Sequence, residues 1–587
     1  MQTDTPTPFR WTLRPVADDE AVTALSEALN RLPPALARTL YLRGVGTFDQ
    51  ARHFFRGGLD GLYDPFLMRD MDRAADRLAE AVTRGERVLV YGDYDVDGTT
   101  STALMTLFLR AQGVETDFFI PNRFEHGYGL GPAGIDYAAE RGAALIVALD
   151  CGITAVEEAA YAKAKGLDLI ICDHHTAEAT LPDAVAVLDP KRPDCPYPFD
   201  GLSGCGVGFK LIQATLQRLA RPPEEAWPYL DLVAVSTASD IVPLVDENRI
   251  LMREGLRQLC VRPRVGLAML AERAGVDLNA CTSSKIVFNL GPRINAAGRL
   301  DDASLAAALL IETDAAAAAR LADRIEALNE ARRDLDRRTS GEALRLAEQH
   351  MAEDPDALAL VLHHDGWHGG VIGITASRVA EHFHRPTVLL TTGQDGLAKG
   401  SARSVKGISI YDALAACSDL LVRFGGHAFA AGLALDPANV PALRDRLSEA
   451  VAAAVTDPEA LTPELEIDAE LDLTHIDDRF WRVLDQFGPF GPDNPRPLFW
   501  GRDLRIVGQP STVGSDGKHL KLRIAQRSGG APFPVIGFGL GDRLDAALTS
   551  VRRGAPVEMA FCVEENRWNG RVSLQLRAKD LRLQGDG

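Results

Sequence analysis

Three aspartates on alternating residues, Asp93, Asp95 and Asp97, directly follow the apolar run 88–91. Gly98 completes the turn, and an apolar helical pattern begins soon after it. Clustered carboxylates repel one another, and burial disfavours their charged form. A divalent cation removes that cost, and hard carboxylate oxygens suit Mg²⁺ or Mn²⁺. The turn is therefore either part of a metal site or a solvated acidic turn, and other residues must decide between the two.

The same spacing matches the first half of a calcium-binding EF-hand loop. That loop needs a glutamate at its twelfth position, where this chain has Leu104, and it needs a helix directly in front. A turn at 85–87 and the run 88–91 stand there instead. Since that run is rich in β-branched and aromatic residues, it predicts a strand. The pattern argues against an EF-hand.

Length and composition limit the class of protein. The 587 residues allow two to four domains, and 46% hydrophobic with 25% charged residues is typical of a globular protein. We find no apolar run of about 18 residues, and the N-terminus resembles neither a signal peptide nor a membrane anchor. The eight cysteines form no Cys-x-x-Cys pair, so neither a disulfide framework nor a zinc site is indicated. We expect a cytoplasmic protein without a membrane partner.

The net charge of −19 argues mildly against a nucleic-acid partner. Net charge is a poor guide, however, when a metal site concentrates acid and another surface carries base. Residues 501–587 contain 14 Lys or Arg against 9 Asp or Glu, a local balance of +5. The charge therefore leaves room for a nucleic-acid-binding surface near the C-terminus.

Residues 1–75 predict a mostly helical region. Beyond them, short apolar runs alternate with alanine-rich helical patterns as far as about residue 245; the runs are 88–91, 115–120, 145–149, 167–172 and 184–188. This alternation predicts an α/β domain with a largely parallel sheet. Such sheets place their sites at the carboxyl ends of the strands.

Acids and histidines stand at the ends of these runs. Asp150 follows 145–149, the triplet Asp173-His174-His175 follows 167–172, and Asp240 closes the run 232–239. Each signal alone is weak, because an aspartate after a strand is most often a helix cap. Together with the aspartate turn they make four such positions in one domain, at strand or segment ends. We therefore expect these side chains to share one site.

Residues 245–310 are helical and loop-rich, with a distinct insertion at 291–299. Its Arg293, Asn295 and Arg299 stand beside glycines, and guanidinium groups fit phosphate oxygens. An ordinary turn with surface arginines explains the segment equally well. Residues 311–352 carry an Ala/Arg/Glu/Leu pattern that predicts a long connecting helix.

Residues 353–460 predict a second α/β unit with three glycine-rich loops, 366–373, 400–404 and 425–432. Glycines let a backbone approach a ligand closely, and Ser401, Arg403 and His427 could donate to phosphate. The alternative is tight packing of turns against helices.

From residue 461 onward, strand patterns alternate with Gly, Asn and Asp turns, as in a small β-barrel of the oligonucleotide-binding (OB) kind. Base and aromatic residues mix there as in a groove for a single strand, although a solvated sheet face is also possible; they are Lys518, His519, Lys521, Arg523, Arg567, Trp568 and Arg571.

With these residues assembled, the chain resembles the DHH phosphoesterase superfamily, named for the triplet Asp173-His174-His175. The aspartate turn, Asp150 and the segment 239–244 are its motifs, and 367–370 with 425–427 mark its DHH-associated domain. The segment 292–299 and the C-terminal β-domain point to the single-strand-specific exonucleases of that superfamily. The resemblance covers nearly the whole chain. It implies a DHH domain with a parallel sheet over 76–310, a connecting helix over 311–352, a DHH-associated α/β domain over 353–460 and an OB-like barrel over 461–587.

One departure is visible. Pyrophosphatase-type members carry a histidine four residues before the first ligating aspartate, and this chain has Tyr91 there. This argues against a small-phosphate hydrolase, and it leaves one metal site with a different ligand set, in which Asp93 is a candidate.

Hydrolysis of a phosphodiester needs an activated water and stabilisation of the charge on the reacting oxygens. Two divalent ions about 3.5–4 Å apart do both. We hypothesise that two Mn²⁺ or Mg²⁺ ions are held by Asp95, Asp97, Asp150, His174 and Asp240, one carboxylate bridging, with Asp93 as a further candidate ligand. His175 would contact the scissile phosphate or orient a ligand.

By resemblance, Arg123, Arg293, Asn295, Arg299, Ser401, Arg403 and His427 are candidates to hold the DNA backbone and its 5′ end. The resemblance implies a monomeric exonuclease that degrades single-stranded DNA from the 5′ end to mononucleotides in repair and recombination. It also implies a single-stranded-DNA-binding protein and a helicase as partners. Two alternatives stay open: a DHH-type phosphodiesterase of short oligonucleotides or cyclic dinucleotides, and a DNA-binding scaffold that has lost catalysis.

Overall fold

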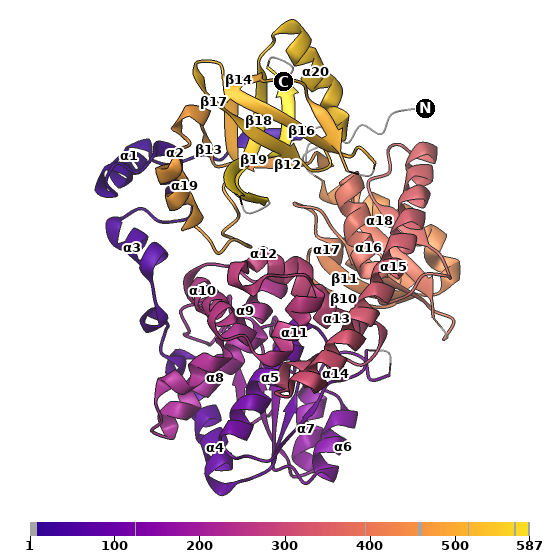
Figure 1. Ribbon diagram of the computed structural model, residues 1–587. Coiled ribbons are helices and arrows are strands. Elements are labelled where there is room, and N and C mark those ends of the chain that lie inside the picture. Colours follow the sequence, from indigo (N-terminus) through magenta and orange to yellow (C-terminus); the bar gives the residue numbers. More distant parts are fainter. Residues whose placement is uncertain are drawn as a thin grey trace. The chain divides into compact units, whose positions relative to one another are not determined.

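The computed structural model describes residues 9–123, 125–393, 395–455, 461–514, 516–568 and 571–584. The chain forms two compact units (Figure 1). One comprises Arg52–Arg332 with Gln486–Pro495, and the other comprises Met1–Ala51, Arg333–Asp485 and Arg496–Gly587. The finer division into five segments made from the sequence remains our proposal. Among the described residues, no helix is both long enough and apolar enough to cross a membrane.

The first unit is built on a five-stranded sheet in which every pair is parallel, as predicted. The strand order is β3-β2-β4-β5-β6, and the bounds are β2 Val88–Tyr91, β3 Thr116–Phe119, β4 Leu145–Leu149, β5 Asp168–Cys172 and β6 Ala186–Leu188. Successive residues of a strand point to opposite faces. Val88 and Val90 accordingly join one core, and Leu89 and Tyr91 join the other. Because both faces are covered, the strands read as continuous apolar runs.

Helices α4 (Met71–Arg84), α5 (Val96–Ala111) and α8 (Gly204–Arg218) cover one face of this sheet, and α6 (Pro132–Glu140) and α7 (Val156–Ala164) cover the other. The core on the face covered by α4, α5 and α8 extends into further helices: α9 Leu230–Ser239, α10 Asp246–Val261, α11 Val265–Arg273, α12 Ser283–Lys285, α13 Gly291–Leu300 and α14 Ser304–Ile311. Short 3₁₀ turns lie at Leu59–Gly61, Pro65–Leu67, Pro223–Tyr229 and Leu278–Ala280, and one π-helical turn at Ile286–Leu290.

Two expectations for this unit differ from the structure. The run 232–239 lies in helix α9, so Asp240 stands at a helix end rather than a strand end. Residues 230–238 are all buried, and a helix that is apolar all round cannot be told from a strand by its period. The insertion 291–299 forms helix α13, with a proline in its first turn, where the missing N–H costs nothing.

Helix α15 (Ala315–Glu353) confirms the long connecting helix and runs from one unit into the other. It leads into a second, mixed sheet with the order β10-β11-β9-β8-β7, in which only β7 and β8 are parallel. The bounds are β7 Leu360–His363, β8 Thr387–Thr392, β9 Ala398–Arg403, β10 Leu421–Gly426 and β11 Ala430–Leu435, with α16 Ile372–Phe383, α17 Ile410–Ala415 and α18 Val440–Ala454.

Two of the three predicted glycine loops in this sheet prove to be mainly strand. Residues 400–403 belong to β9, and most of 425–432 belongs to β10 and β11. Gly400 is needed for packing, since a Cβ there would lie only 2.9 Å from the carbonyl oxygen of Leu389. The segment 366–373 is a loop, as expected, and enters α16.

The C-terminal barrel is confirmed. Five strands close on themselves through the β14–β16 pairing: β14 Phe499–Ile506, β16 His519–Gln526, β17 Gly529–Gly537, β18 Val557–Trp568 and β19 Arg571–Leu583. Helix α20 (Leu544–Arg553) connects β17 to β18, as in an OB-like barrel. Two short strands extend its sheet: β13 Ala469–Glu470 beside β14, and β15 Ser511–Val513 beside β16. Strand β12 (Glu464–Ile467) belongs to a separate two-stranded sheet, and helix α19 (Asp478–Asp485) follows β13 in the chain.

The N-terminal region is mostly helical, with α1 Asp19–Ala28, α2 Pro34–Tyr41 and α3 Phe48–Arg56. It also contains a strand that the sequence analysis missed. This strand, β1 (Arg10–Leu13), pairs in parallel with β12. Four residues carry too little pattern to identify a strand whose partner lies about 450 residues away along the chain.

A buried ion pair supports the first unit away from the sheet edge. The side chains of Lys210 and Glu247 are fully buried and contact each other. Tyr197 donates to Glu247 at 2.6 Å, and the backbone N–H of Tyr63 donates to it at 2.7 Å. Glu247 thereby fastens the segment around Tyr63 to the helical core.

We predict that Glu247→Ala destabilises this unit by about 3–5 kcal/mol, because it leaves the Lys210 ammonium buried without its counter-charge. Urea unfolding measures the change. Lys163→Ala, which removes an exposed partner of Asp183, is the matched control and should leave the midpoint unchanged. Equal midpoints for the two variants would contradict this account.

Candidate metal centre

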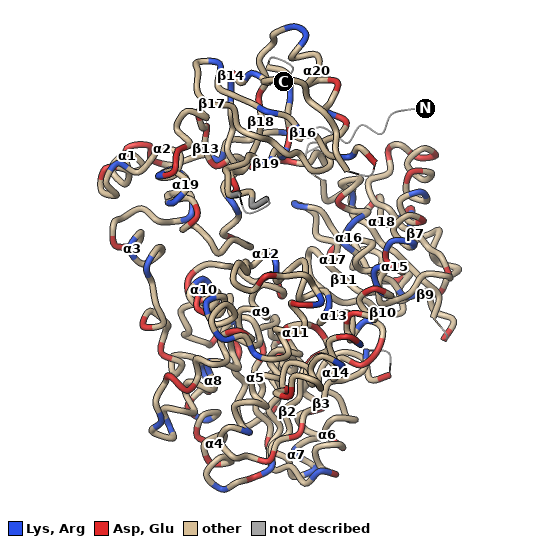
Figure 2. The backbone as a smooth tube through the Cα atoms, in the orientation of Figure 1, with Lys and Arg blue, Asp and Glu red and all other residues tan. Residues whose placement is uncertain are grey.

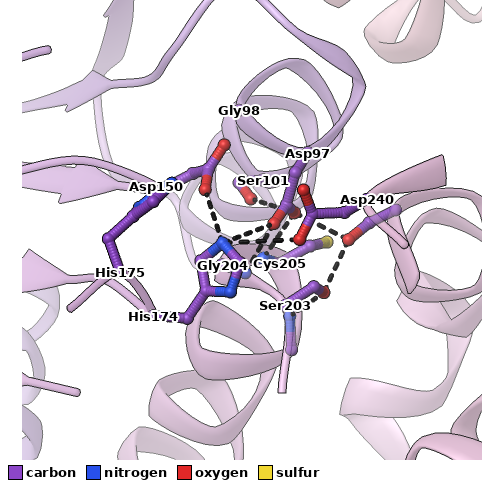
Figure 3. A network of polar contacts seen from close by, with 12 residues as sticks. Asp97, Gly98, Ser101, Asp150, His174, His175, Ser203, Gly204, Cys205 and Asp240 are labelled. Atoms are coloured by element: carbon purple, nitrogen blue, oxygen red, sulfur yellow. Dashed lines mark hydrogen bonds and ion pairs between the residues drawn. The ribbon is translucent and has the colours of Figure 1, made fainter. Parts of the chain in front are cut away.

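The carboxyl edge of the parallel sheet gathers the predicted acids around His174 (Figure 3). The Nε2 atom of His174 lies 3.2 Å from Oδ1 of Asp150, 3.4 Å from Oδ2 of Asp240 and 3.7 Å from Oδ2 of Asp97. These four residues come from four separate segments: the end of β5, the end of β4, the end of α9 and the first turn of α5. The structure therefore brings together side chains that are up to 143 residues apart in the sequence.

Three overlapping groups of these residues could each hold an ion. They are Asp97, His174 and Asp240; Asp93, Asp95 and Asp150; and Asp150, His174 and His175, each with ligand atoms within 4.8 Å of one another. Because Asp150 and His174 each belong to two groups, neighbouring ions could share them. The arrangement fits more than one divalent ion.

Several atoms of the cluster are buried without a hydrogen-bond partner. They are Oδ1 of Asp93, Oδ1 of Asp150, Oδ2 of Asp240 and both ring nitrogens of His174. Buried polar atoms are almost always paired, since an unmet one costs about 1–3 kcal/mol. Carboxylate oxygens suit Mn²⁺ and Mg²⁺, and neutral imidazole nitrogen is a common metal ligand in proteins. A cation is therefore the partner that these orphaned atoms fit.

The electrostatics lead to the same conclusion. Burial, followed by repulsion from neighbouring carboxylates, raises the pKa values of Asp93, Asp150 and Asp240 well above the usual range and also raises that of Asp95. Burial lowers the pKa of His174 to about 4. His174 is thus neutral near pH 7, the state in which imidazole binds metal.

Asp97 is held by the start of helix α8. Its carboxylate accepts the backbone N–H groups of Gly204 at 2.6 Å and Cys205 at 2.8 Å, and the hydroxyl of Ser236 at 2.6 Å. A helix N-terminus is a favourable place for a carboxylate. Asp97 therefore has a fixed position before any ion binds, with Oδ2 directed toward His174.

Asp150 has an unusual backbone conformation, with φ of +61°. Left-handed conformations are uncommon in residues other than glycine and concentrate at functional sites. Asp150 in this conformation packs closely against residue 204, which must be a glycine, since a Cβ there would lie only 2.7 Å from Cβ of Asp150. The start of α8 thus sets the positions of both Asp97 and Asp150.

Asp173 has a role that the sequence analysis did not assign. It accepts the backbone N–H groups of Ile153 at 2.9 Å and His174 at 2.7 Å, and its Oδ1 lies 2.7 Å from Nδ1 of His175. Burial acts to raise its pKa, but the hydrogen bond and charge of His175 and the N–H group of Ile153 together outweigh burial, and the pKa falls to about 2. Asp173 thus orients His175 rather than binding metal. Its place directly before two histidines was the available signal, because a carboxylate commonly orients a histidine at a metal site.

Asp95 caps helix α5, since its Oδ1 accepts the N–H of Gly98 at 3.0 Å. Asp93 lies beside it with an orphaned oxygen, so it belongs to the cluster by position. Tyr91 stands where pyrophosphatase-type members carry a histidine. Its hydroxyl donates to the carbonyl oxygen of Gly129 and accepts the N–H of Gly131, and so it bonds to the backbone rather than to the acids.

The predicted substrate residues fall into two sets. In the first unit, Arg123 lies 4.2 Å over the ring of Tyr94, and Arg293 makes two hydrogen bonds to Glu326 of α15. Asn295 and Arg299 are one turn apart on α13, and therefore on one helix face.

In the second unit, Arg403 donates to the hydroxyl of Ser401 at 2.8 Å on β9, and His427 lies in the turn between β10 and β11. Acidic and basic residues are interleaved through both units (Figure 2). The net negative charge is therefore not confined to one of them.

Three family models match the chain, one over the parallel-sheet domain, one over the second α/β domain and one over the C-terminal barrel. Residues 87–237 match the DHH family N-terminal domain, residues 354–453 match the DHHA1 domain, and residues 467–580 match the RecJ OB domain.

Curated relatives align along nearly the whole chain. The single-stranded-DNA-specific exonuclease RecJ of Salmonella typhimurium is 37% identical over 568 residues, covering 94% of this chain and 96% of the relative. That of Escherichia coli is 36% identical, covering 93% and 95%. That of Bacillus subtilis is 38% identical, covering 97% and 70%.

Solved structures agree with this alignment. RecJ from Thermus thermophilus in complex with Mn²⁺ superimposes with a TM-score of 0.81 at 33% identity, covering 98% of this chain and 79% of that one. The Mg²⁺ complex gives a TM-score of 0.73 at 31% identity, covering 98% and 78%. By its domain models, its aligned relatives and its fold, this chain belongs to the RecJ family of single-stranded-DNA-specific exonucleases.

Proposed function

We propose that this chain is a metal-dependent exonuclease that degrades single-stranded DNA from the 5′ end to mononucleotides, in DNA repair and recombination. The observation that carries the proposal is the buried cluster of Asp93, Asp150, His174 and Asp240, whose orphaned atoms fit divalent ions. Family membership gives this metal chemistry a substrate, because the aligned relatives bear the name of single-stranded-DNA-specific exonucleases.

The cofactors are Mn²⁺ or Mg²⁺, and we propose two ions. Asp97, His174 and Asp240 would hold one, and Asp93, Asp95 and Asp150 the other. Bound there, divalent ions supply an activated water and neutralise charge on the attacked and leaving oxygens.

The protein's own groups prepare this chemistry. The N–H groups at the start of α8 keep Asp97 in place, so the ligand set needs little rearrangement. Asp173 holds Nδ1 of His175, and we propose that Nε2, which lies 3.3 Å from the hydroxyl of Tyr128, contacts the scissile phosphate. Arg123, Asn295 and Arg299, and in the other unit Ser401, Arg403 and His427, are proposed to contact the DNA backbone. Arg293 stays on that list as a prediction, and its guanidinium is already engaged by Glu326.

The barrel supports single-strand binding. On β16, exposed Lys521 and Arg523 alternate with buried Leu520, Leu522 and Ile524, which leaves a basic outer face. His519 packs edge-on against the exposed ring of Phe538, with centroids 5.2 Å apart. Basic and aromatic side chains together are typical of single-strand grooves. The side chains of Arg567, Trp568 and Arg571 lie outside the described residues.

The resemblance also supports a monomeric, cytoplasmic enzyme that acts after a helicase and a single-stranded-DNA-binding protein. A phosphodiesterase of short oligonucleotides or cyclic dinucleotides is the second candidate. It would share the metal cluster but has no need of an OB barrel.

Digestion of long strands labelled at the 5′ or the 3′ end, single or duplex, tests the function. With Mn²⁺, we expect the 5′ label to appear as mononucleotide at the earliest times, with the duplex resistant. A preference for dinucleotides over long strands would favour the second candidate, and early release of the 3′ label would refute the proposed polarity.

Asp240→Ala should lower the cleavage rate at least about 100-fold with no loss of stability, since metal ligands matter chiefly to the reaction and Oδ2 of Asp240 has no hydrogen bond to lose. Asp97→Ala should abolish cleavage as well, but it should also lower the unfolding temperature, because it leaves the first amides of α8 unpaired. Binding of single-stranded DNA should survive in both variants. Full cleavage by either variant would remove it from the ligand set.

Metal affinity should rise with pH. The pKa values of Asp93, Asp150 and Asp240 are higher in the folded protein than in the unfolded chain, so the folded, metal-free protein binds their protons more tightly. The free energy of folding that these protonated groups contribute is present below their usual pKa and is lost as the pH rises to the raised pKa. A cation must displace those protons. His174, with a pKa of about 4, is already neutral and releases none near pH 7.

Calorimetric titration of Mn²⁺ in buffers of different ionisation enthalpy measures this release. We expect fewer protons from Asp240→Ala than from the natural chain. Affinity independent of pH, without proton release, would show that the carboxylates are ionised before the metal binds.

A further inference from the structure

Asp240 is the least buried of the four residues that meet at Nε2 of His174. Its side chain is 20% exposed, whereas those of Asp97, Asp150 and His174 are 6% exposed or less. Its Oδ2 faces His174 (Figure 3) and accepts no hydrogen bond from the described residues, so no donor fixes that oxygen in the way that α8 fixes Asp97. The position of this ligand therefore depends on the backbone on either side of it.

The residue after Asp240 has a strained backbone. Ile241 has φ of +61°, in the left-handed region that costs free energy for residues with a Cβ and is an outlier for a β-branched one. The residue that takes this conformation after a helix is usually glycine. Packing of the side chain does not compensate, since Ile241 is 76% exposed. Contacts elsewhere in the turn must hold the strained conformation.

The turn is anchored directly after the strained residue. The side chains of Val242 and Leu244 are buried, at 7% and 1% exposed. The side-chain amide of Asn248 donates to the carbonyl oxygen of Pro243 at 2.9 Å. The backbone N–H of Leu244 donates to the carbonyl oxygen of Pro492 at 2.8 Å. The last contact comes from a segment about 250 residues further along the chain.

We call this segment, residues 486–495, the strap. It belongs to the same compact unit as the parallel sheet, although the chain before and after it belongs to the other unit. Its first two carbonyl oxygens accept hydrogen bonds from the guanidinium of Arg249, at 2.9 and 2.8 Å. The hydroxyl of Ser283 donates to the carbonyl oxygen of Phe490 at 2.6 Å. The strap is thus fixed to helices α10 and α12.

Gly491 is the point at which the strap packs against the turn. A Cβ at residue 491 would lie 2.4 Å from Cδ1 and 2.9 Å from Cγ of Leu244, so a larger residue would displace that buried side chain. The next residue, Pro492, accepts the hydrogen bond from Leu244. Leu244 is therefore held both by close packing and by a hydrogen bond, four residues after Asp240.

We propose that the strap positions Asp240 for metal binding. By holding Leu244 it keeps Ile241 in the left-handed conformation, and that conformation keeps the carboxylate of Asp240 facing His174. Without the strap, the turn would relax to an unstrained backbone and carry Asp240 away from the other ligands. Gly491 and Pro492 are accordingly positioning residues. This inference rests on the metal centre of the proposed function.

Gly491→Ala tests the contact between strap and turn. Because its Cβ displaces Leu244, the Leu244 amide should exchange with deuterium faster in the metal-free protein. The affinity for Mn²⁺, measured by calorimetric titration, should fall about tenfold. Gly537→Ala is the matched control, since its Cβ would lie 2.8 Å from Cδ1 of Leu540 but at the end of barrel strand β17, and it should change neither quantity. Faster exchange at Leu244 with unchanged affinity for Mn²⁺ would overturn the proposal.

Ile241→Gly tests the strain. Glycine adopts the left-handed conformation freely, so the metal-free variant should unfold at a higher urea concentration than the natural chain and should bind Mn²⁺ equally well. Val261→Gly is the control, because it truncates another exposed β-branched residue, 66% exposed at the end of α10, and should lower the unfolding midpoint. A lower midpoint for Ile241→Gly would show that residue 241 stores no strain, and the proposal would fail.

The double variant separates positioning from a general loss of structure. With no strain to release, a turn with glycine at residue 241 stays in place without the strap. Adding Ile241→Gly to Gly491→Ala should therefore restore the affinity for Mn²⁺ to within about twofold of the natural value. An affinity that stays tenfold low in the double variant contradicts the link between strap and strain. A natural chain that binds no Mn²⁺ would refute the metal centre itself, an outcome distinct from equal binding by the natural chain and Gly491→Ala.

Discussion

Repulsion among buried carboxylates is the constraint on which the rest of this structure depends. Asp93, Asp95, Asp97, Asp150 and Asp240 meet within a few ångströms at one sheet edge. Burial and mutual charge oppose ionisation there and raise the pKa values of Asp93, Asp95, Asp150 and Asp240. Such a cluster must hold either protons or cations. The parallel sheet around it is the scaffold that forces these acids together despite that cost.

The structure divides chemically identical residues into different roles. Asp97 and Asp173 accept hydrogen bonds from backbone N–H groups, so their positions are set by the fold. Asp150 and Asp240 each keep an oxygen that accepts no hydrogen bond and faces His174. The first pair gives the site its rigidity, and the second gives it open ligand positions. A site built only from open carboxylates would lack a fixed geometry, and one built only from engaged carboxylates would have little room for an ion.

The sequence predicted the sheet and its acids well for a physical reason. Strands of a parallel sheet are buried on both faces, so they appear as short apolar runs, and the residue after each run lies at the shared edge. The same reasoning failed for 232–239, because a fully buried helix has the same apolar composition as a strand. It also failed for β9 and β11, where small residues and glycines replace the usual strand pattern. Strand β1 was missed because its partner is distant in the chain.

The sequence by itself determined the order of the domains, the family resemblance and the types of ligand, since these follow from local patterns and motifs. Only the tertiary structure decided which carboxylate atoms are engaged and which are open, because the three shortest hydrogen bonds to Asp97 come from Gly204, Cys205 and Ser236, more than 100 residues away. It likewise decided that Tyr91 clamps a loop and that Asp173 orients His175. Hydrogen bonds between distant segments exist only once the chain is folded, and no local pattern records them.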